Sequence, residues 1–300
     1  DPSFADFILA TEENPIDLLT KRTWSDWKEV NYCEVFEKTE GVTPEINAQA
    51  RLSLVNSPLY LKFIQEVLNA SNEDLVDLTS HEYAESFYQL IWNKKASAYG
   101  FDSLLEAFEK VRNNQRFKDD LNQICEYAMM LANAKTPVNL TFQCPLELHG
   151  VYSRQEIFAA FGKANMSTPS SNREGVMHIA ELDLSLHLLT FKKTEKYFSE
   201  TTSYRDYPIS RTRIHWESQS QTPQDSKVGQ RYLSQAKTGY KVLVFARLEN
   251  KIGKLASPLM YLGLANLVSA YGNKPIEMVW DLESAMPYDF YLGAKVAAGI

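Results

Sequence analysis

The stretch from residue 207 to residue 232 is dense in large hydrogen-bonding side chains. Its sequence, YPISRTRIHWESQSQTPQDSKVGQRY, places arginine, histidine and tryptophan among serine and glutamine. Arginine offers paired donors that fit phosphate oxygens or a guanine edge, and glutamine offers a donor and an acceptor that fit an adenine edge. These residue types favour a surface that reads nucleic acid over a protein core.

We expect double-stranded DNA to be contacted by this stretch and by a few flanking basic residues. Arginine would hold phosphate or guanine, glutamine would read an adenine edge or an extruded base, and a tyrosine would stack on a base. For the lysines of KKTEK (192–196), a solvated hairpin end is the alternative. The expected contacts are Arg154, Lys192, Lys193, Tyr207, Arg211, Arg213, His215, Gln219, Gln221, Gln230 and Arg231.

The spacing within residues 213–219 predicts which of these side chains share a surface. Successive side chains of a strand point to opposite sides, so Arg213, His215 and Gln219 would lie on one face. Glu217 belongs to that face as well, and we interpret the face as a recognition surface rather than an acid–base pair. The opposite, inward-pointing face would consist of Ile214, Trp216 and Ser218.

Several catalytic motifs are missing from the sequence. It has no GxxxxGK[ST] phosphate loop, no GxSxG nucleophile elbow and no HExxH metal motif. The five histidines sit singly, and we interpret His178 and His187, in apolar runs, as structural. We therefore expect no catalytic residue, no metal and no cofactor in this chain.

One weak catalytic alternative remains in the sequence. Glu249-Asn250-Lys251 follows a strand-like run, and Asp183 or Asp225 could complete a metal-dependent nuclease site with it. The pattern E-x-K is common by chance, and here it is typical of a hairpin turn.

Length and charge divide the chain into two parts. Three hundred residues favour two domains. Residues 1–150 carry a net charge of −11 and residues 151–300 carry +4. Residues 205–254 contain ten lysines and arginines but only four acidic residues. This asymmetry predicts different partners for the two halves.

The remaining bulk features indicate a cytoplasmic location. The three cysteines are widely spaced and form no CxxC pair, which favours a reducing compartment. We find no apolar run long enough to span a membrane and no signal peptide pattern. The first residue is aspartate, so we expect the chain to be part of a longer protein.

Hydrophobic periodicity predicts an α+β chain, with an all-α helical domain at residues 1–137 and a mostly antiparallel, β-barrel-like domain with short helices at residues 138–300. Apolar residues recur at helical spacing in segments such as PLYLKFIQEVLNA and FKDDLNQICEYAMMLANA. We expect Trp24, Trp27 and Trp92 to be core residues of this part.

The second part changes to short runs rich in β-branched residues. We expect strands at TPVNLTFQC, GVMHIAEL, SLHLLTFKK, RIHWES, YKVLVFARL, PLMYLGL, LVSAYG and PIEMVWDL, and a terminal helix at AMPYDFYLGAKVAAG. Ser153 and Glu156 have the spacing of a capping box and predict a short helix that begins between them.

Six ordered blocks in residues 145–285 resemble a known bacterial domain. The blocks are LELHGVYSRQEI, REGV, DYPISRTRIHWESQS, GQRY, YLGL and PIEMVWDL. They are similar to the uncharacterised C-terminal domain of fusions between a phospholipase-D-like nuclease and a superfamily II helicase. The family usually has phenylalanine before the histidine of HWESQS, where this chain has Ile214.

The resemblance implies a non-catalytic tail module of a restriction or antiviral defence enzyme. Nuclease and helicase activity would then lie in an upstream part or a partner subunit, onto which the acidic helical domain would dock. The leading hypothesis is a duplex-DNA reader of a sequence or a modified base. A protein-interaction or regulatory module without DNA affinity is the alternative, and a cryptic nuclease at Glu249 and Lys251 is the third reading.

Overall fold

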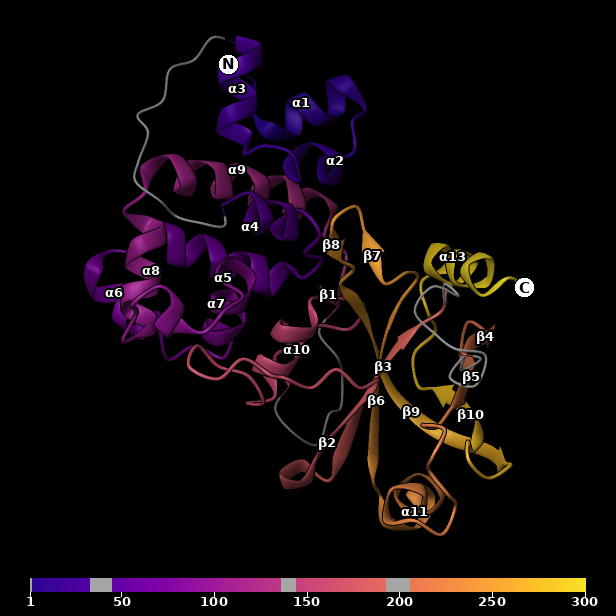
Figure 1. Cartoon of the computed structure of the whole chain (residues 1–300). Helices are drawn as coiled ribbons and strands as arrows, with labels where there is room; N and C mark the ends of the chain where they lie inside the picture. The colour runs from indigo at the N-terminus through magenta and orange to yellow at the C-terminus, as the bar shows by residue number, and fades with distance from the viewer. Residues whose placement is uncertain (1, 33–44, 136–143, 193–205) are drawn as a thin grey trace. The chain divides into compact units, whose positions relative to one another are not determined.

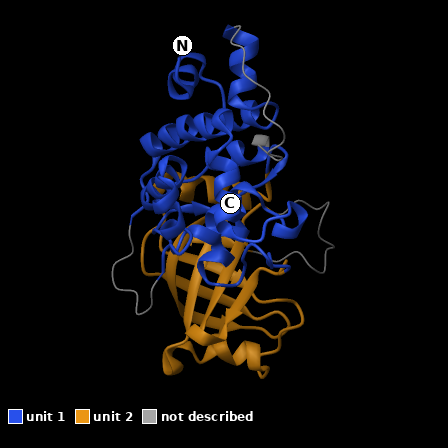
Figure 2. Ribbon diagram, turned by 90° about the vertical axis from the view of Figure 1, so that its left-hand side faces the viewer, with its two compact units in different colours: residues 1–171, 252–258 blue, residues 172–251, 259–300 orange. Residues whose placement is uncertain are grey.

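A computed structural model describes residues 2–32, 45–135, 144–192 and 206–300 (Figure 1). It has a mixed α+β fold, with helices in the N-terminal part and a mostly antiparallel sheet in the C-terminal part. The chain forms two compact units (Figure 2). Unit 1 comprises residues 1–171 and 252–258, and unit 2 comprises residues 172–251 and 259–300. The predicted domain boundary, at residue 137, lies outside the described residues.

Helices build most of unit 1, as predicted. They are α1 (Phe4–Thr11), α2 (Pro15–Leu19), α3 (Trp24–Tyr32), α4 (Glu45–Leu52), α5 (Pro58–Asn69), α6 (Asn72–Leu78), α7 (Ala84–Ile91), the 3-10 turn η1 (Ala96–Ala98), α8 (Leu104–Arg112), α9 (Gln115–Leu131) and α10 (Arg154–Ala160). The unit also contains β1 (Val151–Tyr152) and β8 (Leu255–Ala256). Within the described residues, none of these helices combines the length and the apolar character that crossing a membrane requires.

Local sequence signals explain where several helices begin. The Ser57 side chain caps α5, with Pro58 in the first turn. The predicted capping box is confirmed, because the Ser153 hydroxyl accepts from the Glu156 amide at 3.2 Å and the Glu156 carboxylate accepts from the Ser153 amide at 2.7 Å. Of the tryptophans predicted to be core, Trp24 and Trp92 are buried, and Trp27 is half-buried.

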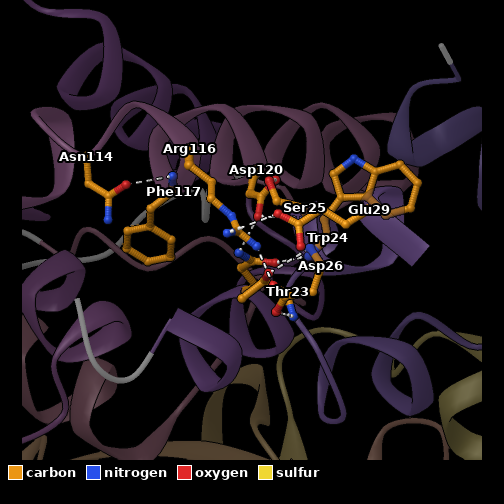
Figure 3. Close-up of polar contacts among 10 residues, drawn as sticks. Thr23, Trp24, Ser25, Asp26, Glu29, Asn114, Arg116, Phe117 and Asp120 are labelled. Carbon is orange, nitrogen blue, oxygen red and sulfur yellow. Dashed lines mark hydrogen bonds and ion pairs between the residues drawn. The ribbon is translucent and has the colours of Figure 1, made fainter. Parts of the chain in front are cut away.

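A buried carboxyl group ties three helices of unit 1 together (Figure 3). Asp120 of α9 accepts hydrogen bonds from the Ser25 amide (3.0 Å), the Ser25 hydroxyl (2.6 Å) and the Gln49 side-chain amide (2.8 Å). One turn earlier, Arg116 pairs with Asp26 of α3. Burial raises the pKa of Asp120 to about 6, although these donors and Lys28 oppose the shift.

This raised pKa predicts a characteristic pH dependence of stability. The folded chain holds the Asp120 proton up to about pH 6, whereas an unfolded aspartate releases it near pH 4. The folded state therefore binds more protons between these values, and the Asp120 contribution to the free energy of unfolding falls as pH rises through them. We expect Asp120→Asn to remove this loss, which amounts to about 3 kcal/mol.

Urea unfolding followed by tryptophan fluorescence at pH 4 to 7 measures the effect. The matched control is Asp119→Asn, because Asp119 is the preceding residue of α9 and its side chain is exposed. Wild type and Asp120→Asn should converge or cross as pH rises. Parallel curves for these two proteins would contradict the assignment.

Unit 2 is built on a sheet whose strands, among the described residues of this unit, run in the order β2-β3-β6-β9-β10-β5-β4. The strands are β2 (Val176–Ile179), β3 (Leu184–Thr190), β4 (Tyr207–Ser210), β5 (Arg213–Glu217), β6 (Lys241–Arg247), β9 (Leu259–Tyr271) and β10 (Glu277–Leu282). β3 and β6 pair in parallel, and the other neighbours are antiparallel. Because β2 and β4 end this order among the described strands, closure into a barrel stays a prediction.

Shorter elements complete unit 2. They are the 3-10 turn η2 (Ala180–Leu182), α11 (Lys227–Leu233), α12 (Gln235–Thr238) and α13 (Tyr288–Ala298). The short strand β7 (Lys251–Ile252) begins at residue 251, where the first segment of the unit ends. The terminal helix and seven of the predicted strand runs are found, whereas most of TPVNLTFQC lies outside the described residues. PLMYLGL and LVSAYG, predicted as two strands, form the single long strand β9.

Strand β9 contains a bulge in its pairing with β6. Its pairing with β6 shifts register between Val244 and Phe245, opposite Gly263. Gly263 has a φ of +88°, a conformation that side chains strongly disfavour. The glycine therefore lets β9 bulge within the first predicted run, and the predicted break at Ala265 and Asn266 is absent because these residues pair with Leu282 and Asp281 of β10.

Candidate functional site

Strand β5 separates a buried face of unit 2 from a polar face. Ile214 and Trp216 are buried, as is Ser218 just beyond the strand, so the predicted inward face is confirmed. Arg213, His215 and Glu217 alternate with them and point to the other side. We call this other side the outer face of the sheet.

Arg213 is already held by an acidic partner on the outer face. Its guanidinium donates to Asp281 of β10 through two bonds, Nε–Oδ1 at 2.5 Å and a second nitrogen to Oδ2 at 2.8 Å. These hydrogen bonds lower the pKa of the Asp281 carboxyl. A phosphate that contacts Arg213 must therefore compete with Asp281.

His215 lies under the ring of Tyr207 from the adjacent strand β4. The two rings stack with centroids 4.6 Å apart and planes 10° from parallel, and the strand register places the two residues opposite each other. His215 is consequently only 5% exposed. Its Nε2 lies 3.5 Å from Glu277 Oε2 of β10. Tyr207 therefore covers the histidine with one face of its ring.

A pocket of about 250 Å³ opens in unit 2 beside the buried face. It is lined by the segment before β2, by β2 and β3, by the turn after β5, by α11 and by Tyr240. Its polar side chains are Asn172, Glu174, His178, Ser185, Gln219 and Arg231. Tyr232 and Tyr240 contribute aromatic rings to the same walls.

Hydrogen bonds order the polar groups of the pocket. Gln219 Nε2 donates to Glu174 Oε2 at 2.7 Å. His178 Nδ1 and the Tyr240 hydroxyl are hydrogen-bonded at 2.7 Å. The pocket thus carries an amide, a carboxylate, a guanidinium and phenols, which together offer both hydrogen-bond donors and hydrogen-bond acceptors.

Tyr232 of the pocket lining belongs to a buried aromatic cluster. The His187 ring lies 4.4 Å from Trp216 and 5.3 Å from Tyr232, measured between centroids. His187 also forms a hydrogen bond with Ser185 at 3.0 Å. Burial lowers the pKa of His187 to about 3, so its imidazole is neutral near pH 7. The prediction of a structural role fits His187, whereas His178 lines the pocket.

The predicted contact residues do not gather at one place. Tyr207, Arg213 and His215 lie on the outer face, and Gln219 and Arg231 line the pocket. Gln219 differs from the expected shared face because β5 ends at Glu217 and a turn follows, in which the Thr222 amide donates to the Gln219 carbonyl at 2.9 Å.

Most of the other predicted contacts have intramolecular partners. Arg211 Nε donates to the Met286 carbonyl at 2.9 Å, and Gln230 Nε2 donates to the Gln224 carbonyl at 2.8 Å. Lys192 pairs with Glu249 at 2.8 Å, which also engages the glutamate of the nuclease hypothesis. Gln221 is exposed.

Two predicted contacts lie elsewhere. Arg154 belongs to unit 1, where its guanidinium lies 5.6 Å from the centre of the Phe158 ring. Lys193 lies outside the described residues. The predicted contact residues therefore fall on two surfaces of unit 2, and some of them lie on neither surface.

The sequence prediction missed several pocket residues. Asn172, Ser185 and Tyr240 lie in segments with no distinctive motif, and only the fold brings them together. Glu174 and Tyr232 carried a usable signal, because they belong to the REGV and GQRY blocks of the resemblance.

Comparisons with known proteins identify a domain but no activity. Residues 146–293 match the family described as "Domain of unknown function (DUF3427)", so the chain contains a DUF3427 domain. No curated protein matches the sequence.

Two solved structures that resemble this chain are crystal structures of Arabidopsis thaliana SUVH6 in complex with SAM. For form 2, identity is 10%, the TM-score is 0.34, and the match covers 83% of this chain and 42% of SUVH6. For form 1, identity is 10%, the TM-score is 0.29, and the shares are 81% and 39%. The chain thus spans about two fifths of SUVH6, and similarity this low supports no inference.

Gly229 provides a test of how the pocket wall is built. It lies in α11, where a Cβ would collide with the Pro223 carbonyl and lie 2.9 Å from the Gln224 carbonyl. Helix propensity alone predicts that Gly229→Ala stabilises the protein by up to about 1 kcal/mol. We expect the opposite, a destabilisation of about 1–3 kcal/mol, because the backbone of the preceding turn must move.

Thermal unfolding of Gly229→Ala measures this sign. Lys227→Ala, an exposed position in the same helix, controls for substitution as such. An unchanged or raised unfolding temperature in Gly229→Ala would show that the close approach is relieved without cost.

Proposed function

We propose that unit 2 is a DNA-recognition module and that its pocket accepts one nucleobase extruded from the duplex. The observation that supports this best is the pocket itself, where Glu174, Gln219 and Arg231 meet the rings of Tyr232 and Tyr240. Enzymes and readers that extrude a base recognise it through hydrogen bonds to its edge and through contacts with aromatic faces.

The size and chemistry of the pocket suit a single base. Its volume of about 250 Å³ is below the range of about 300–1,000 Å³ that is usual for drug-sized ligands. The Glu174 carboxylate accepts hydrogen bonds and repels phosphate, so it favours the exocyclic amino group of a base. Arg231 is the cation among the lining residues and is suited to a phosphate that flanks the extruded base.

Charge supports a nucleic-acid partner for this part of the chain. Residues 205–254 contain ten lysines and arginines against four acidic residues, although the whole chain carries −7. Phosphate contacts supply most of the sequence-independent affinity for DNA. Arg211 and Gln221 are exposed and suited to the duplex flanking an extruded base.

The wider setting follows from the sequence resemblance. We propose that the chain is the non-catalytic part of a bacterial restriction or defence enzyme in the cytoplasm. Its nuclease and helicase activities would reside in upstream domains or a separate subunit, and unit 1 would dock onto that motor.

Substitutions in the pocket test base recognition. We expect Gln219→Ala and Arg231→Ala each to weaken binding about tenfold, within the ~1–3 kcal/mol typical of a base contact. A duplex carrying 2-aminopurine should gain fluorescence on binding, because an extruded base leaves the stack. The measurements are anisotropy and 2-aminopurine emission. Lys237→Ala, exposed on α12 and away from the pocket lining, should match wild type.

Salt dependence tests the phosphate contacts separately. Replacing Arg211 and Arg213 together by alanine should weaken duplex binding at least several-fold and reduce the slope of log affinity against log salt. Asp281→Asn should strengthen binding, because it weakens the pair that holds Arg213. Unchanged affinity in the folded double variant would remove the outer face from the DNA interface and leave the pocket to be judged alone.

A protein-interaction module is the second candidate, and a specific observation favours it. Arg213, Gln230 and Lys192 are engaged by groups of the chain itself. Such a self-supporting network needs no nucleic acid. Capture of a nuclease or helicase subunit by a chain that fails to bind any duplex at low salt would favour this function.

A further inference from the structure

The outer face of the sheet holds two carboxylates directly opposite each other. Glu217 of β5 and Glu277 of β10 are register partners in an antiparallel pair. Like charges at such positions repel and destabilise the sheet. His215 also faces this place, with its Nε2 3.5 Å from Glu277 Oε2. That contact can neutralise at most one carboxylate, and only when the imidazole is protonated.

The three side chains are close enough to share one ion. One ligand atom from each of His215, Glu217 and Glu277 lies within 4.8 Å of the others. Zinc binds nitrogen and oxygen ligands at about 2.0–2.2 Å, so ligand atoms around it stand about 3–4 Å apart. Small rotations of the two glutamates therefore suffice. We propose that His215, Glu217 and Glu277 form a binding site for a divalent transition-metal ion.

Neighbouring aromatic residues hold the proposed ligands in place. Tyr271 of β9 is the register partner of Glu277, and its hydroxyl forms a hydrogen bond with the Glu277 carboxylate. The Tyr207 ring stacks on His215 with planes 10° apart and restricts its rotation. Groups that orient metal ligands in this way are typical of built metal sites.

The donor set determines the class of metal. One imidazole nitrogen with two carboxylate oxygens suits Zn²⁺ or Mn²⁺, whereas Mg²⁺ and Ca²⁺ prefer oxygen ligands only. Three protein ligands leave positions for water or for an anionic ligand, as in open zinc sites. The site shares no residue with the pocket lining, so it stands independently of the proposed base recognition.

Binding of Mn²⁺ to the tag-free, metal-stripped full chain tests the proposal. Mn²⁺ is the better probe, because the three cysteines of the chain can hold Zn²⁺ elsewhere. We expect the electron paramagnetic resonance signal of free Mn²⁺ to fall with one ion bound per chain. Glu277→Gln should weaken this binding at least about tenfold.

Two further variants keep the test specific. Glu283→Gln, an exposed glutamate just after β10, should bind Mn²⁺ like wild type. Tyr271→Phe keeps all three ligands and should weaken Mn²⁺ binding about tenfold. If Glu277→Gln does not fold, Tyr271→Phe takes its place as the test variant. Added Mn²⁺ should raise the unfolding temperature of wild type and Glu283→Gln but not of Glu277→Gln.

Two results would overturn the proposal. One is the absence of saturable Mn²⁺ binding by the folded wild-type chain. The other is equal binding by wild type, Glu277→Gln and Tyr271→Phe, which would place the ion at another site.

Discussion

The aromatic cluster of His187, Trp216, Tyr232 and Trp280 connects both polar surfaces of unit 2. It joins β3, β5, β10 and α11 through ring contacts. Because Trp216 points into this cluster, its neighbours His215 and Glu217 must point out onto the other face of the sheet. Because Tyr232 packs against the same rings, α11 stands where its Arg231 lines the pocket. The burial of Trp216 and its contact with Tyr232 thus determine how both the outer face and the pocket are oriented.

A neutral imidazole makes this cluster possible. His187 is 1% exposed, and a charged group at that place would lose its hydration without an ion partner to replace it. Its low pKa keeps it neutral, and Ser185 satisfies a ring nitrogen. In unit 1 the buried carboxyl group of Asp120 is stabilised in another way. It accepts hydrogen bonds from three donors that belong to two other helices. Both units therefore bury a titratable group and specify its partners closely.

The two surfaces of unit 2 differ in their chemistry. The pocket combines amide, carboxylate, guanidinium and phenol groups, and it suits a planar ligand that forms several hydrogen bonds. The outer face carries fixed ion pairs and a group of potential metal ligands. Arg213 illustrates why composition alone misjudges such a face, because its bidentate pair with Asp281 makes it part of the sheet before it is part of any interface.

The sequence determined the features that depend on neighbours along the chain. Helical periodicity in unit 1, the capping box at Ser153 and the alternation of Ile214 and Trp216 with His215 are local effects, and each was predictable. The merging of two strand runs into β9 was not, because it depends on the pairing of Ala265 and Asn266 with Leu282 and Asp281 of the distant strand β10.

The candidate sites show the same division. The residues of YPISRTRIHWESQSQTPQDSKVGQRY were recognised as polar, hydrogen-bonding types, but their distribution over the surfaces of unit 2 was not predictable. Gln219 lies only four residues after His215, yet it lines the pocket because a turn begins at Gln219, just after β5. Glu277 reaches Glu217 only through the pairing of β10 with β5. Sequence by itself fixed which side chains were present and which way they alternate, whereas strand pairing between distant segments decided which of them meet.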